Sequence, residues 1–399
     1  MAEWIECKIS DIGTVVGGAT PSTKKAENYE GGNISWITPK DLSTFSGRYI
    51  KRGERNITET GLKSCSTQLM PKNTVLFSSR APIGYVAIAA NEVCTNQGFK
   101  SVIPNENTDA LFLYYLLKYN KDKIESMGSG TTFKEVSGNT MKNIVVSAPT
   151  DKKVQENIAS VLGSIDDKIE ENERINNNLE QQAVALFDNA IQKAESVSYA
   201  ELSTLADVKG GKRLPKGVNL ITIPNSHPYI RVRDLNSTVF ASLSPEYEYV
   251  DDETQKTISR YVVSQGDVLI SIVGTIGLTA IVDSTLNNAN LTENCVKLTN
   301  LKTITPEYLL LYLRSSKGAE AISKGTVGAV QLKLPIKNIQ SILVPLLDEL
   351  ELQSLNDILS AIFSQISANI VENRKLADMR DALLPKLMSG ELDVTDIDL

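Results

Sequence analysis

Residues 153–190, KVQENIASVLGSIDDKIEENERINNNLEQQAVALFDNA, decide the fold because the chain carries their pattern twice. Apolar side chains recur there at alternating steps of four and three residues, at Ile158, Leu162, Ile165, Ile169, Leu179, Ala183, Leu186 and Ala190. The second copy lies 197 residues further on, at Leu355, Leu359, Ile362, Ile366, Leu376, Arg380, Leu383 and Leu387. This spacing, kept over about four heptads, is typical of a coiled-coil seam, so the sequence predicts two long helices.

Each predicted seam is interrupted by two asparagines at the same heptad phase, Asn172 and Asn176 in the first copy and Asn369 and Asn373 in the second. Amphipathic helices packed on globular domains are the simpler interpretation, but such packing would not require the same polar interruption in two places. We hypothesise that Asn172 and Asn369 meet near an approximate twofold axis and fix the register of the two helices.

The length of 399 residues predicts two or more domains. No apolar run approaches the ~20 residues that a membrane span requires. The start, MAEWIECKIS, lacks the apolar segment of a signal peptide. We therefore expect a cytoplasmic protein with no membrane partner. Paired or metal-ligand spacing is missing from the four cysteines, which we expect to be reduced thiols: Cys7, Cys65, Cys94 and Cys295.

The net charge of −7 is unevenly distributed along the chain. Residues 1–150 carry a net charge of +3 and residues 196–347 carry +2, whereas residues 151–195 carry −5 and residues 348–399 carry −7. The acidity therefore belongs to the predicted helices. The globular parts remain compatible with a nucleic-acid partner, for which local patches matter more than the total charge.

Residues 1–150 have the pattern of a mixed α/β domain. Short β-like runs, such as residues 34–38 and 74–77, alternate with turns rich in Gly, Pro, Asn and Ser. Helical spacing predicts one helix over residues 108–121. Pro149 should end the last strand, and Asp151 is the expected N-cap of the first long helix.

Residues 196–347 repeat this plan, which indicates an internal duplication of units of about 200 residues. WITPKDL at 36–42 corresponds to YIRVRDL at 229–235, and VLFSSRAPIG at 75–84 corresponds to VLISIVGTIG at 268–277, both at an offset of 193. TNQGFK at 95–100 resembles TENCVK at 292–297, and KNI at 142–144 recurs at 337–339. Chance similarity would not keep this order along the whole chain.

The predicted fold is therefore α+β, with a pseudo-twofold internal repeat. Mixed α/β domains at 1–150 and 196–347 are separated by long helices in 151–195 and 348–392, which form an antiparallel coiled coil. Helices of ~40 residues are ~60 Å long, and antiparallel pairing would put one globular domain at each end, whereas parallel pairing would put both at one end. Two similar but non-identical domains at a set distance suit duplex DNA with two unlike half-sites about one helical turn, ~10 bp, apart.

Two basic loops are the first candidates for DNA contact, GGATPSTKK at 17–25 and GGKRLPKG at 210–217. Small residues let the main chain approach a phosphate, hydroxyls donate to it, and lysines supply charge. Neither loop has the GxxxxGK[ST] spacing of a P-loop, and an ordinary hairpin turn is the alternative. The candidate residues are Gly18, Thr20, Ser22, Lys24, Lys25, Lys212, Arg213 and Lys216.

Base readout is the expected role of a second group, Ser79, Arg80, Arg231 and Arg233, because arginine reads guanine through O6 and N7 in the major groove. Structural ion pairs are the alternative for these arginines. The loops GSGTT at 128–132 and KGTVG at 324–328 fall at the same point of each repeat, which suggests a shared surface, with mere connection as an equal alternative. Their candidate residues are Thr131, Lys324 and Thr326.

Catalytic constellations are missing from the sequence. The single histidine, His227, lies beside Pro228 in a predicted turn. No CxxC or HxxxH spacing suggests zinc, and neither an Asp-Pro-Pro-Tyr-like adenine pocket nor the Gly-rich loop of a methyltransferase is present. A metal nuclease built from the common acidic residues stays open. Otherwise the sequence predicts a recognition protein with no catalytic residue, cofactor or metal of its own.

Together these motifs resemble those of the specificity subunits of type I restriction-modification systems. The resemblance spans essentially the full chain and lies in GGATPST at 17–23, ISWITPKD at 34–41, VLFSSRAPIG at 75–84, Asn96-Gln97-Gly98, GKRLPK at 211–216 and YIRVRD at 229–234. These motifs add Lys40, Asn96, Gln97 and Thr275 to the candidate DNA-binding residues. The second half departs from the first at Gly274-Thr275 and lacks Asn-Gln-Gly, as two domains that read different sequences would.

The resemblance implies a division of labour. Each globular part would be a target-recognition domain for double-stranded DNA. The helices would space these domains and dock two modification subunits, which use S-adenosylmethionine to methylate adenine. Restriction subunits would use ATP and Mg to translocate and cleave DNA, and this chain would perform no reaction.

Three alternatives stay open. The chain could serve a related two-part restriction system with a fused nuclease-methyltransferase, it could be a coiled-coil adaptor whose end domains bind protein or glycan, or it could be a self-sufficient enzyme. Neighbouring genes, binding to random duplex, and activity of the purified chain would distinguish them.

Overall fold

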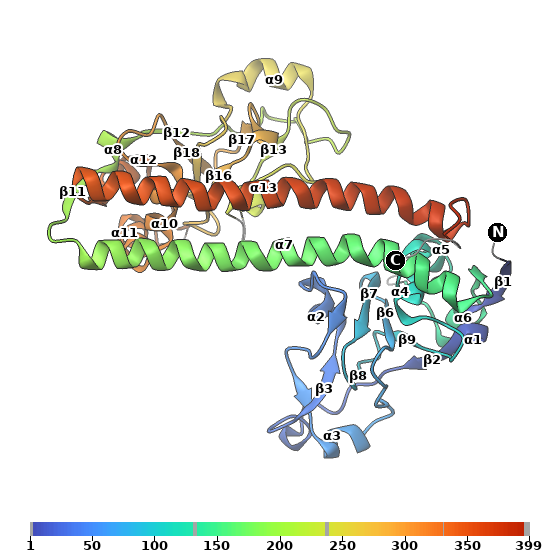
Figure 1. The fold of residues 1–399 in the computed structure, drawn as a ribbon. Helices are drawn as coiled ribbons and strands as arrows, with labels where there is room; N and C mark the ends of the chain where they lie inside the picture. The colour runs from blue at the N-terminus through green and yellow to red at the C-terminus, as the bar shows by residue number, and fades with distance from the viewer. Residues whose placement is uncertain (1–2, 131–133, 236–238, 330, 395–399) are drawn as a thin grey trace. The chain divides into compact units, whose positions relative to one another are not determined.

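The structure is a computed structural model that describes residues 3–130, 134–235, 239–329 and 331–394 (Figure 1). The chain divides into two compact units, residues 1–171 with 372–399, and residues 172–371. Both long helices run through the two units. Within the described ranges, no helix combines the length and apolar character that crossing a membrane requires.

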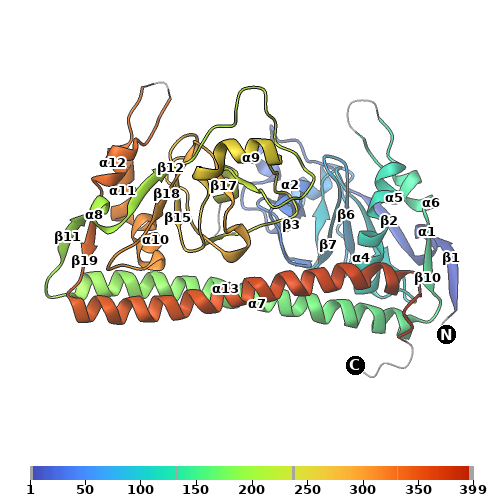
Figure 2. The same ribbon diagram turned by 90° about the horizontal axis from the view of Figure 1, so that it is seen from above.

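The two predicted long helices are present and lie side by side, α7 over Lys152–Lys193 and α13 over Glu349–Met388 (Figures 1 and 2). In the first unit Asp166 of α7 contacts Arg380 of α13, and Ile169 contacts Asn373. Rising numbers in α7 thus meet falling numbers in α13, which confirms the antiparallel pairing. The Asp151 carboxylate accepts a hydrogen bond from the Lys153 N–H at 2.8 Å and caps α7 as predicted.

Buried asparagines do meet between the helices. In the second unit the Asn369 side-chain amide donates to the Asn176 side-chain oxygen at 2.7 Å. In the first unit Asn373 donates to the main-chain carbonyl of Ile169 at 3.3 Å. Our hypothesis named Asn172 as the residue that meets Asn369, whereas the acceptor of this hydrogen bond is Asn176, one helical turn further along α7.

One part of the predicted apolar seam was wrong. Leu186 is 37% exposed, whereas its neighbour Phe187 is buried and packs edge-on against Tyr308, with ring centroids 5.0 Å apart. An α-helix has 3.6 residues per turn, so a strict seven-residue repeat drifts around it. Beyond the asparagines α7 also packs against the globular part of its own unit, which selects a different face.

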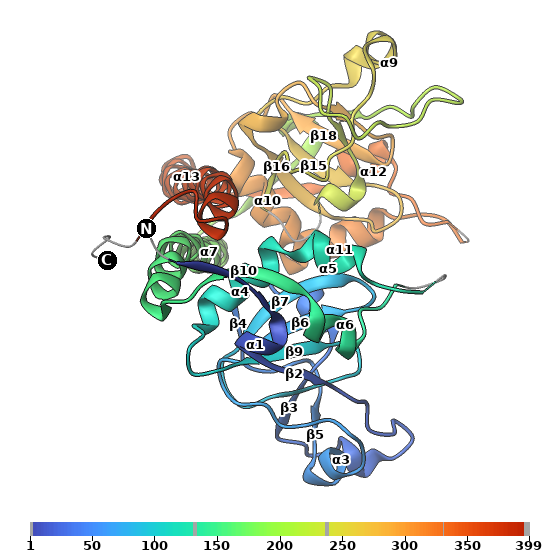
Figure 3. The ribbon, with the colours of Figure 1, turned by 90° about the vertical axis from the view of Figure 1, so that its right-hand side faces the viewer.

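The first unit is built on a five-stranded sheet of order β2-β9-β6-β7-β4 (Figure 3). Its strands are β2 (Gly13–Gly17), β4 (Tyr49–Ile50), β6 (Val75–Ser79), β7 (Ile83–Ala89) and β9 (Lys100–Pro104). Helix α4 (Ala110–Tyr119) packs between this sheet and α7, and it confirms the helix predicted over residues 108–121. Its side chains Phe112 and Tyr115 are fully buried in the main core.

Smaller sheets complete the first unit. β3 (Ile34–Ile37) pairs with β5 (Asn56–Ile57) and, in parallel, with β8 (Cys94–Thr95), while β1 (Trp4–Lys8) pairs with β10 (Val145–Pro149). The short helices are α1 (Ile9–Ile12), α2 (Pro39–Ser43), α3 (Glu59–Lys63), α5 (Lys121–Ser126) and α6 (Gly138–Asn143).

The second unit has the same topology, with a five-stranded sheet of order β12-β18-β15-β16-β14. Its strands are β12 (Asp207–Gly210), β14 (Phe240–Ala241), β15 (Val268–Ser271), β16 (Thr279–Val282) and β18 (Cys295–Thr299). β13 (Tyr229–Ile230) pairs in parallel with β17 (Asn290–Leu291), and β11 (Ser198–Glu201) pairs with β19 (Leu343–Leu346). Its helices besides α7 and α13 are α8 (Leu202–Leu205), α9 (Asp252–Ile258), α10 (Pro306–Arg314), α11 (Ser316–Gly325) and α12 (Ile336–Gln340). The matching strand orders confirm the internal duplication.

Candidate nucleic-acid interface

The loop at residues 17–25 is held against the end of β8. A Cβ at Gly18 would lie 2.2 Å from the carbonyl oxygens of both Thr95 and Asn96, so only glycine fits this approach. The Ala19 N–H donates to the Thr95 carbonyl at 3.0 Å, and the Thr20 hydroxyl donates to the Gln97 side-chain oxygen. Gly18 therefore seats the loop against its own sheet and does not line an open phosphate cradle.

The loop at residues 210–217 is held in the same way. A Cβ at Gly211 would lie 2.0 Å from the Thr292 carbonyl oxygen. The Lys212 N–H donates to the Leu291 carbonyl at 2.8 Å, and the Lys212 ammonium lies 5.4 Å from the ring centroid of Tyr261. Gly18 and Gly211 lie 193 residues apart, at equivalent places of the duplicated sequence.

Each loop is also anchored by an aromatic side chain from the next strand. The Trp36 indole N–H donates to the Ala19 carbonyl at 3.1 Å in the first unit. The Tyr229 hydroxyl donates to the Lys212 carbonyl at 2.8 Å in the second. Different side chains thus make the same main-chain contact at the same offset of 193 residues. The motif alignment could have identified these two anchors, but we did not single them out.

The turn after β8 adjoins the first loop. Asn96 accepts a hydrogen bond from the Gly98 N–H at 2.9 Å, and Gln97 is exposed beside Thr20. A Cβ at Gly98 would meet the ring of Pro39, the first residue of α2, so this turn and Lys40 of α2 lie close together. The exposed Lys40 ammonium pairs with Glu54 at 2.7 Å.

Ser79 does not belong to this surface. It is fully buried at the end of β6, and its hydroxyl donates to the Gly98 carbonyl at 3.2 Å. All five residues of β6 are buried because both faces of this strand are covered. We therefore remove Ser79 from the candidate contacts.

Arg80, the next residue, is half-buried and lies 3.6 Å from the Glu135 carboxylate. Glu135 forms a short hairpin with Ser129 and also pairs with Lys100 at 3.3 Å. Thr131, predicted in the loop between them, lies outside the described residues. In the second unit Val327 and Lys333 close the equivalent hairpin.

Lys324 and Thr326 lie at the start of this second hairpin. Lys324 is exposed and pairs with Glu320 one helical turn earlier, at 2.6 Å. The Thr326 hydroxyl donates to the Ile322 carbonyl at 2.8 Å. Thr275 is exposed in the β15–β16 turn, where its carbonyl accepts from Ser271 at 2.6 Å, as the Pro82 carbonyl accepts from Ser78 in the first unit.

Arg231 and Arg233 share one carboxylate. Arg231 and Arg233 both pair with Glu248, the latter at 3.1 Å. The Asp234 carboxylate accepts the Arg231 main-chain N–H at 2.7 Å and lies 3.5 Å from Arg233. Burial raises the pKa of Asp234 to about 6, although Arg233 opposes the shift. The ion pairs that we considered as the alternative are therefore present.

These arginines line a cavity of about 370 Å³ next to the second loop. Arg213 of that loop lines it too and pairs with Glu293 at 2.7 Å. Lys24, Lys216 and Ser22 are exposed, and neither lysine forms an ion pair with a described residue. Lys25 is exposed and lies 3.6 Å from Glu27. The candidate surface of each unit thus combines two kinds of cation. Its exposed lysine forms no ion pair with a described residue, whereas its arginines pair with carboxylates that a DNA phosphate or base could displace.

The described residues contain no group of three His, Cys, Asp or Glu side chains arranged to hold a metal ion. His227 pairs with the exposed Asp252 at 3.0 Å. Cys7, Cys65, Cys94 and Cys295 are free, and burial raises the pKa of the Cys94 and Cys295 thiols to about 12. Buried thiols with raised pKa values are inert.

The duplicated sheets, their unlike basic loops and the paired helices define a two-domain recognition protein. The sequence matches the family described as "Type I restriction modification DNA specificity domain" over residues 1–181 and again over 195–375, and the chain belongs to this family. It is 32% identical over 420 aligned residues to the MjaIX type I restriction enzyme specificity subunit of Methanocaldococcus jannaschii, with 99% of this chain and 95% of that protein covered. It is therefore a specificity subunit and not a catalytic subunit.

Two further relatives agree with this assignment. The specificity subunit of the Escherichia coli enzyme EcoR124I/EcoR124II is 33% identical over 116 residues, which cover 27% of each chain. The crystal structure of a type I restriction-modification S subunit from M. genitalium has a TM-score of 0.59 at 17% identity, with 97% of this chain and 96% of that chain covered. This second likeness concerns the fold alone.

Proposed function

We propose that this chain reads a two-part, asymmetric DNA sequence for a type I restriction-modification complex, one half with each unit's globular part. The observation that carries the proposal is the repeated anchoring of a basic loop. In each unit a glycine seats the loop against the sheet, and Trp36 or Tyr229 holds its main chain. The loop sequences differ, so one scaffold presents two different chemistries, which is what two unlike half-sites require.

The lysines are the proposed phosphate contacts. Lys24 and Lys216 are exposed and need not break an ion pair with any described residue before they bind. Phosphate contacts position a protein on DNA, and side chains that reach base edges provide specificity. The proposed surface comprises Thr20, Ser22, Lys24, Lys25, Lys40, Arg80, Asn96 and Gln97, and in the second half Lys212, Arg213, Lys216, Arg231, Arg233, Thr275, Lys324 and Thr326. Gly18 supports the first loop from below, and Thr131 lies outside the described residues.

Arg233 is the strongest candidate for base readout. Its side chain is 58% exposed, against 26% for Arg231, and both share Glu248. When Arg233 turns toward a base, Arg231 still neutralises Glu248, and Asp234 keeps the hydrogen bond from the Arg231 main-chain N–H. Arg80 is in a similar position. When it leaves Glu135, Lys100 stays beside that carboxylate.

The acidic helices are the proposed docking elements for protein partners. Residues 151–195 and 348–399 carry net charges of −5 and −7, which repel DNA. Two modification subunits would bring S-adenosylmethionine for adenine methylation, and restriction subunits would bring ATP and Mg for translocation and cleavage. The complex would act in the cytoplasm, and this chain would supply no cofactor.

The experiment that tests the proposal is mapping of methylated adenines in genomes with and without the gene. A single two-part motif that depends on the gene is expected. Residues 1–150 are then exchanged for the corresponding segment of a relative. The exchange should change one half of the motif and leave the other half intact. A change in both halves would rule out independent readers.

Binding measurements separate this proposal from a coiled-coil adaptor. DNA binding through phosphates weakens steeply between about 50 and 200 mM salt, because counterions are released. If neither the chain alone nor its complex with modification subunits binds any duplex at low salt, the adaptor becomes the better description.

A further inference from the structure

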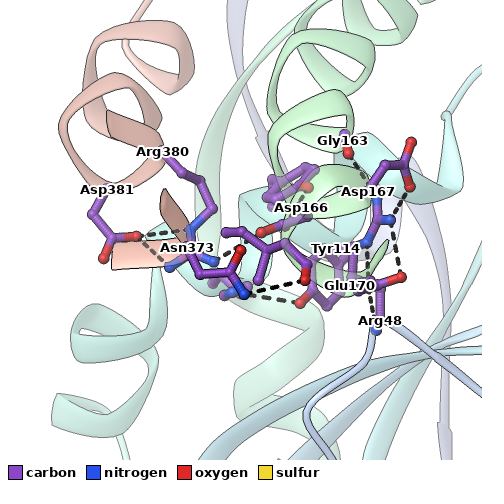
Figure 4. A network of polar contacts seen from close by, with 12 residues as sticks. Arg48, Tyr114, Gly163, Asp166, Asp167, Glu170, Asn373, Arg380 and Asp381 are labelled. Atoms are coloured by element: carbon purple, nitrogen blue, oxygen red, sulfur yellow. Dashed lines mark hydrogen bonds and ion pairs between the residues drawn. The ribbon is translucent and has the colours of Figure 1, made fainter. Parts of the chain in front are cut away.

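One buried arginine of the globular part of the first unit contacts α7 at several points. Arg48 directly precedes β4 at the edge of the five-stranded sheet, where its carbonyl accepts from the Ile88 N–H at 2.7 Å. Its side chain is only 4% exposed and reaches α7 (Figure 4). There Nε lies 2.9 Å from Glu170 Oε1, Nη1 donates to the Gly163 carbonyl at 3.2 Å, and Nη2 pairs with Asp167.

These contacts fix the orientation of the first globular part relative to α7 as well as its position. The Arg48 main-chain N–H also donates to Glu170 Oε1, at 3.1 Å, so the main chain and side chain of one residue bind the same carboxylate. Burial alone would lower the pKa of Arg48, but the ion pairs with Glu170 and Asp167 raise it above its ordinary value, so the guanidinium stays charged. A planar guanidinium that donates several hydrogen bonds at once allows its partners little rotation.

A second polar contact reinforces the first. Asp166 of α7 accepts from the Tyr115 hydroxyl of α4 at 2.6 Å and from Arg380 of α13 at 2.8 Å. The Asp166 side chain is only 7% exposed. This explains why the apolar seam of α13 contains an arginine. The sheet edge, α4, α7 and α13 of the first unit are thus joined by directional, charged contacts.

The second unit uses a different chemistry at the equivalent place. Phe363 of α13 lies 197 residues after Asp166, and Ala183 of α7 lies 197 residues before Arg380. Phe363 packs edge-on against Phe240 of β14, with ring centroids 6.2 Å apart. Apolar packing is far less directional than a forked ion pair. At this place the two globular parts therefore contact their helices through different side chains, charged in the first unit and aromatic in the second.

We propose that Arg48, acting through Asp167 and Glu170, sets the direction in which the first recognition domain faces from α7. It thereby restricts the spacing between half-sites that the complex accepts. Arg48 is a positioning residue in this role and does not touch DNA. The inference rests on the proposed function, because a spacing exists only if both domains read one duplex.

The test measures how strongly the full chain, in complex with its modification subunits, prefers its own half-site spacing. Duplexes are used in which the two mapped half-sites are moved one base pair closer or further apart. Arg48→Met, which keeps length but removes charge and donors, should reduce this preference about tenfold, equivalent to about 1.4 kcal/mol. The half-site sequences should not change. Glu170→Gln should act in the same direction with a smaller effect.

Phe240→Leu is the matched control at the apolar contact of the second unit. It should lower thermal stability and leave the spacing preference intact, so a general loss of stability is distinguished from a loss of direction. An Arg48→Met complex that folds and keeps the wild-type preference would overturn the inference. If that variant does not fold, an unchanged preference in both Arg48→Lys and Glu170→Gln overturns it. Failure of the wild-type complex to bind any duplex would instead refute the proposed function.

Discussion

Asn369 of α13 donates a hydrogen bond from its side-chain amide to the side-chain oxygen of Asn176 in α7, at 2.7 Å. Both asparagines are buried, and Gln365 donates to the Asn369 oxygen at 2.8 Å. Sliding one helix past the other would separate the two amides and leave the buried Asn176 oxygen without this donor. A buried amide without a partner is costly, so the pair selects one register.

Replacing one member of this pair should destabilise the protein more than replacing both. Asn369→Leu leaves the buried Asn176 oxygen without its donor, and we expect a loss of about 1–3 kcal/mol in the free energy of unfolding. The double variant Asn176→Leu/Asn369→Leu should recover most of this loss, because two leucines extend the apolar seam. Urea unfolding of the four proteins in a double-mutant cycle measures the difference.

Asn178 of α7 provides the control for this cycle. Its exposed side chain accepts a hydrogen bond from the nearby Gln182, so Asn178→Leu should change stability by less than about 0.5 kcal/mol. Wild-type stability in Asn369→Leu would show that the buried pair has no part in setting the register.

The aromatic anchors predict effects confined to one half-site each. Tyr229→Phe removes the donor to the Lys212 carbonyl and loosens the loop that presents Arg213. The loss of about 1 kcal/mol should weaken DNA binding about fivefold. Competition with duplexes altered in one half at a time should assign the whole loss to the half read by the second unit. Trp36→Phe is the counterpart and should affect only the other half; equal losses in both halves for either variant would contradict this assignment.

Lys24 and Lys216 should each contribute one phosphate contact. Lys24→Ala or Lys216→Ala should weaken binding to specific and random duplexes alike. Each should reduce the slope of log affinity against log salt by about 0.9. Titrations at several salt concentrations measure this slope. Lys123→Ala is the control, because the Lys123 ammonium already donates to the Val145 carbonyl at 2.7 Å, and its slope should stay at the wild-type value.

The raised pKa of Asp234 predicts that its contribution to the free energy of unfolding falls as pH rises. Burial raises its pKa in the folded protein to about 6, above the value of 3.8 for an exposed aspartate. Between about pH 4 and 6 the folded state therefore binds more protons than the unfolded state, and stability decreases with rising pH. Asp234→Asn keeps an acceptor for the Arg231 N–H but cannot titrate. Relative to wild type, it should gain up to about 3 kcal/mol across this window in unfolding experiments.

Asp251 provides a control of opposite sign. The Thr254 main-chain N–H donates to its carboxylate at 2.7 Å, and hydrogen bonds from Thr254 lower the pKa of Asp251. The stability that Asp251 contributes is present above its unfolded pKa and is lost as pH falls through the lower folded value. Asp251→Asn should therefore lose stability relative to wild type as pH rises. The same trend in both variants would mean that the burial of Asp234 is not the cause.

The large features of the fold could be predicted because they depend on periodicity and repetition. The seam spacing predicted α7 and α13, and constant offsets between the two halves predicted two sheets of one plan. Residue positions inside elements were less predictable. Ser79 seemed available because the predicted strand ended at residue 77, whereas β6 continues through Ser79 and is buried on both faces. Spacing carries no information about how far a neighbouring layer covers a strand.

Partners of the candidate arginines also could not be predicted. Glu135 lies 55 residues from Arg80, and Glu293 lies 80 residues from Arg213, so only the folded sheet brings each pair together. The same holds for Arg48, which no motif singled out. Its carboxylates lie more than 100 residues away on α7, and nothing in its local sequence distinguishes it from an exposed arginine.

The shared carboxylate of Asp166 has a consequence for synthesis on the ribosome. Its hydroxyl partner, Tyr115, emerges before it, but its cationic partner, Arg380, is translated 214 residues later, near the end of the message. A nascent chain that already contains the whole first recognition domain therefore holds an acidic group that lacks this counter-ion. Products of premature termination between residues 347 and 380 would keep both readers yet never complete that junction. A buried carboxylate without its cation would thus distinguish such truncated products from the complete chain.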